Sequence, residues 1–265
     1  MIKIAITASI DKSNNKINTA YIEAFTNKEL LPIIIPTIVD EIADFTIESK
    51  EKEYLEKAKE VAETFDALIL TGGSDINPLI YQKENKDALS CNSKRDKSDL
   101  YLVEAFIKKN KPIMGICRGM QFLGLTFEIP NFKQDLNQIE ELHNGENHEL
   151  SSRQEFAHSI ELQGKLLEYI EEKTQKKELN VNSFHHQGFA FIARKKDKET
   201  FTIDKEEEIK KINEKTNINI LANTKRVIEA FEHKTLPIFA VQWHPEEYGN
   251  KSIIINYFID NYLKD

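Results

Sequence analysis

The first half of the chain alternates short apolar runs with amphipathic stretches, and this rhythm restricts the fold more than any other feature. Strand-like apolar runs are expected at residues 2–8, 31–36, 67–70 and 112–116. Amphipathic helices are expected at residues 20–30 and 51–65, from about residue 100 after a polar lead-in at 96–99, and from about residue 118. Strands that alternate with helices predict an α/β fold, in which helices cover both faces of a mostly parallel sheet.

The second half has a different rhythm, in which strand-like runs follow one another closely. These runs are expected at residues 156–162, 179–184, 189–193, 218–222, 227–231 and 238–242, and a terminal helix at 253–263. Short connections favour antiparallel pairing, so extra antiparallel strands are expected in this half. No internal repeat or linker divides the sequence, and residues 1–265 are interpreted as a single domain.

One segment, residues 195–215, is dominated by Lys and Glu and has few apolar anchors. We interpret it as a charged surface insertion that is partly helical across residues 205–213, because a run of mixed charges is usually a solvated face. A partner-binding element is the alternative, but no further feature of the sequence favours it.

Charge and cysteine content argue against several classes of protein. The chain has a net charge of −8, so non-specific nucleic-acid binding, which needs clustered Lys and Arg, is not expected. No stretch approaches the roughly 20 apolar residues that cross a bilayer, so no membrane association is expected. Two cysteines are too few for a secreted disulfide framework, which favours the reducing cytoplasm.

The strongest chemical signal is the heptapeptide Gly115–Gln121, which follows a predicted strand and opens a predicted helix. A nucleophile on such a turn needs small neighbours because the chain bends sharply, and Gly115 and Gly119 supply them. The dipole and unpaired N–H groups of the helix N-terminus then favour the thiolate of Cys117. Taken alone, the heptapeptide fits equally well with Cys117 as a small core residue at a strand end.

Two further turns also follow predicted strands. In Val241–Glu246, the carboxylate of Glu246 can orient His244, whose other ring nitrogen then faces a thiol, although a lone His-x-Glu is a weak signal. In Leu70–Pro78, consecutive glycines can aim N–H groups at an oxyanion, and an ordinary glycine turn is the alternative. Strand ends of a parallel sheet gather at one edge, so the three turns together predict one acyl-transfer site.

These motifs, together with the block Asn182–Gln187, resemble the class I glutamine amidotransferase-like γ-glutamyl hydrolases, peptidase family C26. The resemblance covers nearly the whole chain and is strongest to the γ-glutamyl-γ-aminobutyrate hydrolases. The Cys and His-x-Glu elements are shared across the superfamily, whereas Asn77-Pro78, Arg95-Asp96 and Asn182–Gln187 are more specific to the hydrolase branch. The resemblance implies a single-domain, flavodoxin-like fold.

The resemblance also implies the roles of five residues. Cys117 would attack the γ-carbonyl of a glutamyl group, His244 would move the proton, and Glu246 would orient His244. The backbone N–H groups of Gly73 and Arg118 would form the oxyanion hole. The implied reaction passes through a cysteine thioester and releases glutamate and a free amine from a small-molecule γ-glutamyl substrate, without cofactor or metal. A homodimer would suit the fold.

Other residues receive weaker assignments. Gln121 and His185 would bind substrate, with an ordinary helix position and a scaffold role as the respective alternatives. Cys91 has no matching role. A zinc site is not expected, because three of the other histidines, His143, His148 and His158, share no metal-ligand spacing with a Cys or carboxylate set.

Three stretches depart from the family pattern. Glu128–Asn131 occupies a place where the family usually has paired glycines before a Gln-Asp dipeptide. The hairpin turn Asn223–Arg226 has no glycine, so Asn223 is expected at positive φ. Residues 195–215 look longer than their family counterpart, and their position after His185 suggests the hypothesis that they cover or narrow the substrate entrance.

Two other functions stay open. The chain could be a glutaminase subunit that passes ammonia to a separate synthetase, or a non-catalytic module that kept the fold. The presence of Cys117, His244 and Glu246 argues against the second. The sequence does not name the leaving amine, because γ-glutamyl-γ-aminobutyrate, γ-glutamyl polyamines, γ-glutamyl peptides and polyglutamyl folates share the glutamyl half.

Overall fold

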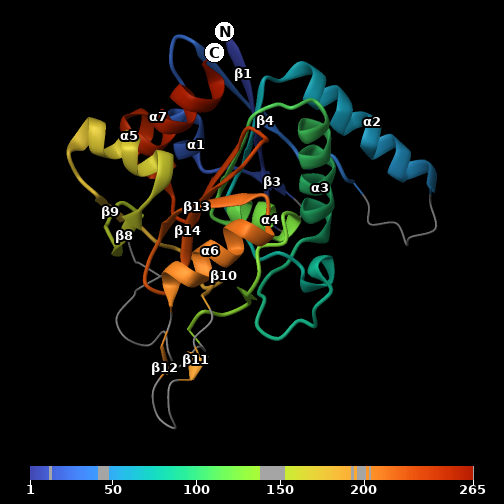
Figure 1. The fold of residues 1–265 in the computed structure, drawn as a ribbon. Coiled ribbons are helices and arrows are strands. Elements are labelled where there is room, and N and C mark those ends of the chain that lie inside the picture. Colours follow the sequence, from blue (N-terminus) through green and yellow to red (C-terminus); the bar gives the residue numbers. More distant parts are fainter. Residues whose placement is uncertain are drawn as a thin grey trace.

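A nine-stranded sheet forms the centre of the computed structural model, which describes residues 1–11, 14–40, 48–137, 153–191, 194–195, 201–202 and 204–264 (Figure 1). In spatial order the strands are β4 (Leu30–Ile35), β1 (Ile2–Thr7), β5 (Ala67–Leu70), β6 (Ile113–Ile116), β15 (Ile238–Val241), β14 (Ile228–His233), β13 (Ile218–Asn223), β8 (His158–Leu162) and β9 (Glu178–Val181). Strands β4, β1, β5, β6 and β15 are parallel neighbours. The remaining neighbours pair antiparallel. The predicted α/β fold, with antiparallel strands added in the second half, is confirmed.

Helices cover both faces of the sheet, because its strands alternate their side chains between two cores. In β1, Ile4 and Ile6 belong to one core and Ala5 to the other. The first core is covered by α1 (Thr19–Ala24), α5 (Gly164–Thr174) and α7 (Ile253–Phe258), which the π-turn η4 (Ile259–Leu263) extends. The second is covered by α2 (Glu48–Thr64), α3 (Ser93–Lys108), α4 (Arg118–Thr126) and α6 (Lys205–Lys215). None of the described helices is long and apolar enough to cross a membrane.

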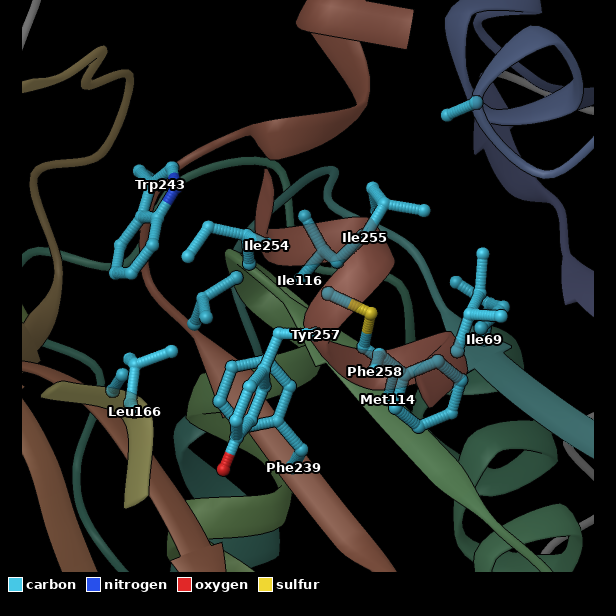
Figure 2. Close-up of a cluster of buried hydrophobic side chains, with 14 of the residues drawn as sticks. Ile69, Met114, Ile116, Leu166, Phe239, Trp243, Ile254, Ile255, Tyr257 and Phe258 are labelled. Atoms are coloured by element: carbon cyan, nitrogen blue, oxygen red, sulfur yellow. The ribbon is translucent and has the colours of Figure 1, made fainter. Parts of the chain in front are cut away.

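Figure 2 shows the first core, where α7 packs over the middle of the sheet. Ile254, Tyr257 and Phe258 of α7 belong to the same cluster as Met114 of β6, and so does Trp243, which is 1% exposed. Burying an aromatic side chain of this size contributes about 4–6 kcal/mol relative to leaving it in water. Trp243 therefore fixes the turn that follows β15.

Two helices have different bounds from those expected. Helix α3 begins at Ser93 because the Asn92 side chain accepts from the backbone N–H of Arg95, an N-cap that moves the helix start seven residues earlier than residue 100. The polar lead-in 96–99 therefore lies inside the helix, and three of its four residues are buried. Helix α1 ends at Ala24 rather than near residue 30, because Asn27 caps the backbone N–H groups of Glu29 and Leu30 and turns the chain into β4.

The structure also contains elements that the sequence did not predict. Helix α5 follows β8, and a hairpin of β2 (Ser9–Asp11) and β3 (Asn14–Lys16) follows β1. Short elements complete the fold: β7 (Phe132–Lys133), β10 (Gly188–Phe189), β11 (Arg194–Lys195), β12 (Phe201–Thr202), η1 (Pro78–Tyr81) and η3 (Pro245–Lys251). Of the strand expected at 189–193, Phe189 lies in β10, which pairs with β7 outside the main sheet, while residues 192–193 lie outside the described residues.

The departures from the family pattern have local solutions. Glu128 and Asn131 both adopt positive φ, 59° and 63°, and so take conformations that glycine adopts more easily. The expectation of positive φ at Asn223 was wrong. Instead, the Thr224 hydroxyl accepts from the backbone N–H groups of Arg226 and Val227, and the side chain closes the turn.

The charged segment is partly a packed helix. Asp204 caps α6, and Ile209 and Ile212 are buried in the second core against β13. The predicted helix is thus present, but it is amphipathic and anchored rather than simply solvated. The rest of the segment, apart from the strand pairs of β11 and β12, lies outside the described residues.

Candidate active site

Cys117 sits on a tight turn between β6 and α4, with φ of 53° and ψ of −108°. A non-glycine residue held in such a conformation stores about 1–3 kcal/mol of backbone strain, which the surrounding structure must offset. The Cys117 N–H donates to the Val241 carbonyl at 2.8 Å, and Gly119 packs so closely on β5 that an added Cβ would lie 2.2 Å from the Leu70 carbonyl oxygen. The sequence prediction of a nucleophile turn matches this geometry.

His244 and Glu246 follow the neighbouring strand β15 and form a buried pair. The Nδ1 atom of His244 and Oε1 of Glu246 are 2.6 Å apart. Burial alone would lower the pKa of His244, but the interactions with Glu246 and Cys117 outweigh it and raise the pKa to about 10. This raised pKa favours the imidazolium form of His244 next to Cys117.

Gly72 shows how closely these groups gather. A Cβ placed on Gly72 would lie 2.8 Å from Cε1 of His244 and 3.5 Å from Cβ of Cys117. Only glycine fits at this position of the loop after β5, because a side chain would clash with the imidazole ring of His244. The structure therefore brings the three predicted turns to one edge of the sheet.

Asn182 holds the backbone of His244 from the end of β9. Its side-chain amide donates to the His244 carbonyl at 3.0 Å, and its amide oxygen accepts from the His244 N–H at 2.9 Å. The ring of Phe184 stands edge-on to the imidazole, with centroids 6.0 Å apart. The block Asn182–Gln187, identified from the sequence only by resemblance, thus positions the base.

Tyr21 of α1 is a residue of the site that the sequence did not reveal. Its hydroxyl accepts from the Gly72 N–H at 2.8 Å, and burial followed by the charge of Glu246 raises its pKa well above the usual value. Helix α1 packs against η3, the segment that carries Glu246. A lone Tyr on an amphipathic helix gives no chemical signal in the sequence, so only the fold could place it here.

The two predicted oxyanion donors, Gly73 and Arg118, lie in the loop after β5 and at the start of α4, and their roles stay predictions. Gly73 has φ of +147°, and Arg118 is the first residue of α4. The side chains of Arg95 and Asp96, the motif that the sequence links to the hydrolase branch, are buried beneath the site, where Asp96 pairs with Arg118.

A cavity of about 950 Å³ opens beside His244. Its lining includes Tyr21, Gly72 and Gly73, together with residues of the β2–β3 hairpin and Arg153. This volume is large enough for a dipeptide-sized substrate. No described residue of 195–215 lines the cavity, so the hypothesis that this segment narrows the entrance gains no support from its placed part.

The remaining predicted residues lie elsewhere. Gln121 is buried, and its amide donates to the carbonyl of Gln187 and to the side chain of Gln242. His185 contacts the same Gln187 carbonyl through Nδ1. Neither lines the cavity, and their substrate-binding roles stay predictions.

The other histidines show no metal-binding arrangement in the described part of the chain. His158 pairs with the buried Glu229 at 3.2 Å, while His143 and His148 lie outside the described residues. Across the described ranges, no group of three or more His, Cys, Asp or Glu side chains is arranged to hold a metal ion.

The raised pKa of His244 predicts the pH dependence of a Glu246→Gln variant. The imidazolium that protonates a leaving group is lost as pH rises through its pKa, about 10 in the wild type. Removing the carboxylate charge lowers that pKa, so the alkaline limb of kcat/KM should move to lower pH by about 1–3 units. Glu247→Gln is the matched control, since Glu247 pairs with Asn18 and Arg153 rather than with His244. An alkaline limb that stays in place in Glu246→Gln would contradict the assignment.

Comparison with known proteins gives a consistent family assignment. The family model described as Peptidase C26 matches residues 3–246. The glutamine amidotransferase-like protein YvdE of Lactococcus lactis is 30% identical over 197 residues, 72% of this chain and 70% of the relative. The γ-glutamyl-γ-aminobutyrate hydrolase PuuD of Escherichia coli K12 is 28% identical over 203 residues, 73% of this chain and 70% of the relative.

The fold is similar to solved glutaminase structures. The glutaminase domain of Trypanosoma brucei CTPS, solved with bound acivicin, aligns with 100% of this chain and 95% of that one, with a TM-score of 0.54 and 12% identity. At this identity the similarity shows the glutamine amidotransferase fold alone.

Proposed function

The chain belongs to the peptidase C26 family of class I glutamine amidotransferase-like hydrolases, and we propose that it hydrolyses γ-glutamyl amide bonds with Cys117 as nucleophile. One observation carries the proposal: His244 is held by Glu246 at 2.6 Å beside a cysteine on a strained strand-to-helix turn. A thiol, an oriented base and a carboxylate in this order make up the machinery of acyl transfer.

In the first half-reaction, the Cys117 thiolate adds to the γ-carbonyl carbon, and the carbonyl π electrons move onto oxygen. The N–H groups of Gly73 and Arg118 face the resulting oxyanion, and each such donor typically contributes about 3 kcal/mol. The intermediate collapses as the C–N bond breaks, and the His244 imidazolium gives its proton to the leaving nitrogen. The products are a free amine and a γ-glutamyl thioester.

In the second half-reaction, neutral His244 takes a proton from water as the water oxygen adds to the thioester carbonyl. The C–S bond then breaks, glutamate leaves, and the thiolate–imidazolium pair is restored. Glu246 keeps the ring of His244 in one orientation through both steps, since its carboxylate accepts from Nδ1.

We propose γ-glutamyl-γ-aminobutyrate or a related γ-glutamyl amine or peptide as the substrate. The E. coli relative that carries this activity in its name supports the choice, and so does the cavity of about 950 Å³. A glutaminase subunit that supplies ammonia to a separate synthetase is the second candidate, and it is supported by the carbamoyl phosphate synthase small chain of Aquifex aeolicus, which is 29% identical over 170 residues, 62% of this chain. We further propose that the enzyme works in the cytoplasm, because its two cysteines are both free thiols.

The test is glutamate release by the purified chain alone from γ-glutamyl-γ-aminobutyrate, a γ-glutamyl polyamine, a polyglutamyl folate and glutamine. We expect at least one γ-glutamyl amide other than glutamine to be hydrolysed with a higher kcat/KM than glutamine. Turnover of glutamine alone would overturn the hydrolase proposal in favour of the glutaminase. No turnover of any substrate, with a Cys117 thiol that resists alkylation at neutral pH, would contradict both.

A further inference from the structure

Four charged side chains are buried together beneath the candidate site. Arg95, Asp96 and Asp99 come from the first turns of α3, and Arg118 follows the nucleophile, and none is more than 1% exposed. Two cations and two anions balance one another, so the cluster has little net charge. Burying this many charges is costly unless each has a partner, so such a cluster contributes little net stability. We therefore look for its role in the segments that it holds in place.

The Arg118 side of the cluster ties the nucleophile turn to α3. Its guanidinium donates to Asp96 through Nη2 and to Asp99 through Nη1. Burial opposes its charge, but Asp99 and Asp96 together raise its pKa above the usual value. Arg118 is also the residue whose backbone N–H is one of the two proposed oxyanion donors, so anchoring its side chain fixes where that N–H points.

The Arg95 side ties the loop after β5 to the same helix. Its Nη2 donates to the carbonyl and to the hydroxyl of Thr71 at 2.8 and 2.9 Å, and its Nε lies 3.6 Å from Asp99. Its Nη1 lies where a side chain on Gly73 would be, 2.0 Å from the Cβ position. Among the described residues this buried Nη1 has no hydrogen-bond partner.

Asp96 joins the Arg118 side of the cluster to the loop after β5, while Asp99 contacts both arginines. One carboxylate oxygen accepts from Arg118, and the other accepts from the backbone N–H of Asn77 at 3.1 Å. The loop 71–77 and the turn 117–118 are therefore attached to one rigid element, although they follow different strands.

We propose that Arg95 is a positioning residue, which sets the Gly73 N–H at the correct separation from the Arg118 N–H in the oxyanion hole. This inference rests on the proposed function. Arg95 acts through Thr71 and Gly73 and touches neither substrate nor thiol. A guanidinium is suited to this place because its planar fork can reach two acceptors on the loop while it stays beside Asp99, and a Lys side chain offers only a single nitrogen.

The test separates oxyanion stabilisation from thiol activation. Alkylation of Cys117 by iodoacetamide needs the thiolate but forms no oxyanion, whereas turnover needs both. In Arg95→Lys we expect kcat for the preferred γ-glutamyl substrate to fall about 10²–10³-fold, the loss typical of one oxyanion donor. KM and the alkylation rate should each stay within about threefold of wild type. Lys108→Gln, which removes a charge from the exposed end of α3, is the control and should change neither rate.

A second pair of variants tests the same proposal if Arg95→Lys does not fold. Thr71→Val keeps the side-chain shape and removes the hydroxyl that accepts from Arg95 and donates to the Thr7 carbonyl, so kcat should fall about tenfold with alkylation unchanged. Thr71→Ser restores the hydroxyl and should restore kcat.

Three outcomes would overturn the inference: a folded Arg95→Lys enzyme with unchanged kcat, an equal loss of kcat and alkylation rate, or an unchanged kcat in Thr71→Val. In each case wild-type turnover leaves the proposed function standing. A wild type that releases glutamate from no γ-glutamyl amide contradicts both.

Discussion

Replacing Cys117 by alanine is expected to lower kcat for γ-glutamyl hydrolysis by at least about 10⁴-fold. The thiol forms the covalent bond on which both half-reactions depend, and removal of a nucleophile from a triad enzyme costs about as much as removal of the whole triad. The variant should fold normally, since alanine removes only a sulfur from a site that is 5% exposed. The measurement is kcat under saturating substrate, with circular dichroism to check the fold.

Cys91→Ala provides the matched control for this loss. Cys91 is the other thiol, half-buried near the same cavity, and burial raises its pKa, so it is poorly suited to attack. We expect kcat to change by less than about tenfold and the fast-alkylating thiol to remain. If Cys91→Ala were as inactive as Cys117→Ala, the assignment of the nucleophile would be wrong.

Gly119→Ala is expected to lower the free energy of unfolding by about 4 kcal/mol or more. The new Cβ would lie 2.2 Å from the carbonyl oxygen of Leu70 and 2.8 Å from its carbonyl carbon. Both are backbone atoms of a central strand, so the clash can be relieved only by moving α4 away from β5. Overpacking usually costs 1–3 kcal/mol, and a rigid backbone neighbour puts this case at the upper end or beyond. Thermal unfolding should show a Tm lower by about 10 °C or more.

Gly249→Ala separates this clash from the general effect of replacing a glycine. Gly249 has φ of +61° and no atom within 4 Å of an added Cβ, so alanine there meets only backbone strain of about 1–2 kcal/mol. The Tm should fall by about 2–8 °C. An equal decrease in Tm in the two variants would show that the turn can widen. The close packing of Gly119 against β5 would then not be required for stability.

The sequence predicted the fold and the three turns of the site because both depend on local patterns. Strands and helices appear as changes in apolar spacing, and the C-terminal ends of parallel strands meet at one edge. The sequence alone therefore predicts that Cys117, His244 and Gly73 lie near one another. The prediction failed where a capping side chain decided a boundary, as Asn92 does for α3.

The supporting residues could not be predicted in the same way. Tyr21 reaches Gly72 from α1, and Asn182 reaches His244 from the end of β9, so neither contact follows from spacing along the chain. The motif Arg95-Asp96 is visible in the sequence, but the burial of both side chains depends on where α3 packs. Such long-range contacts are fixed by the assembled core rather than by any window of sequence.

The pairing of β6 with β15 has a consequence for how the enzyme matures. Ile116 lies opposite Val241, so the strands that carry the nucleophile and the base are separated by almost half the chain. Closing so long a loop is entropically slow, and such contacts form late in folding. A growing or refolding chain therefore carries the Cys117 thiol before it has His244 to activate it, and an incomplete chain would have an unreactive thiol. Recovery of activity during refolding should lag behind the early rise of the helical circular dichroism signal and coincide with the docking of the C-terminal half.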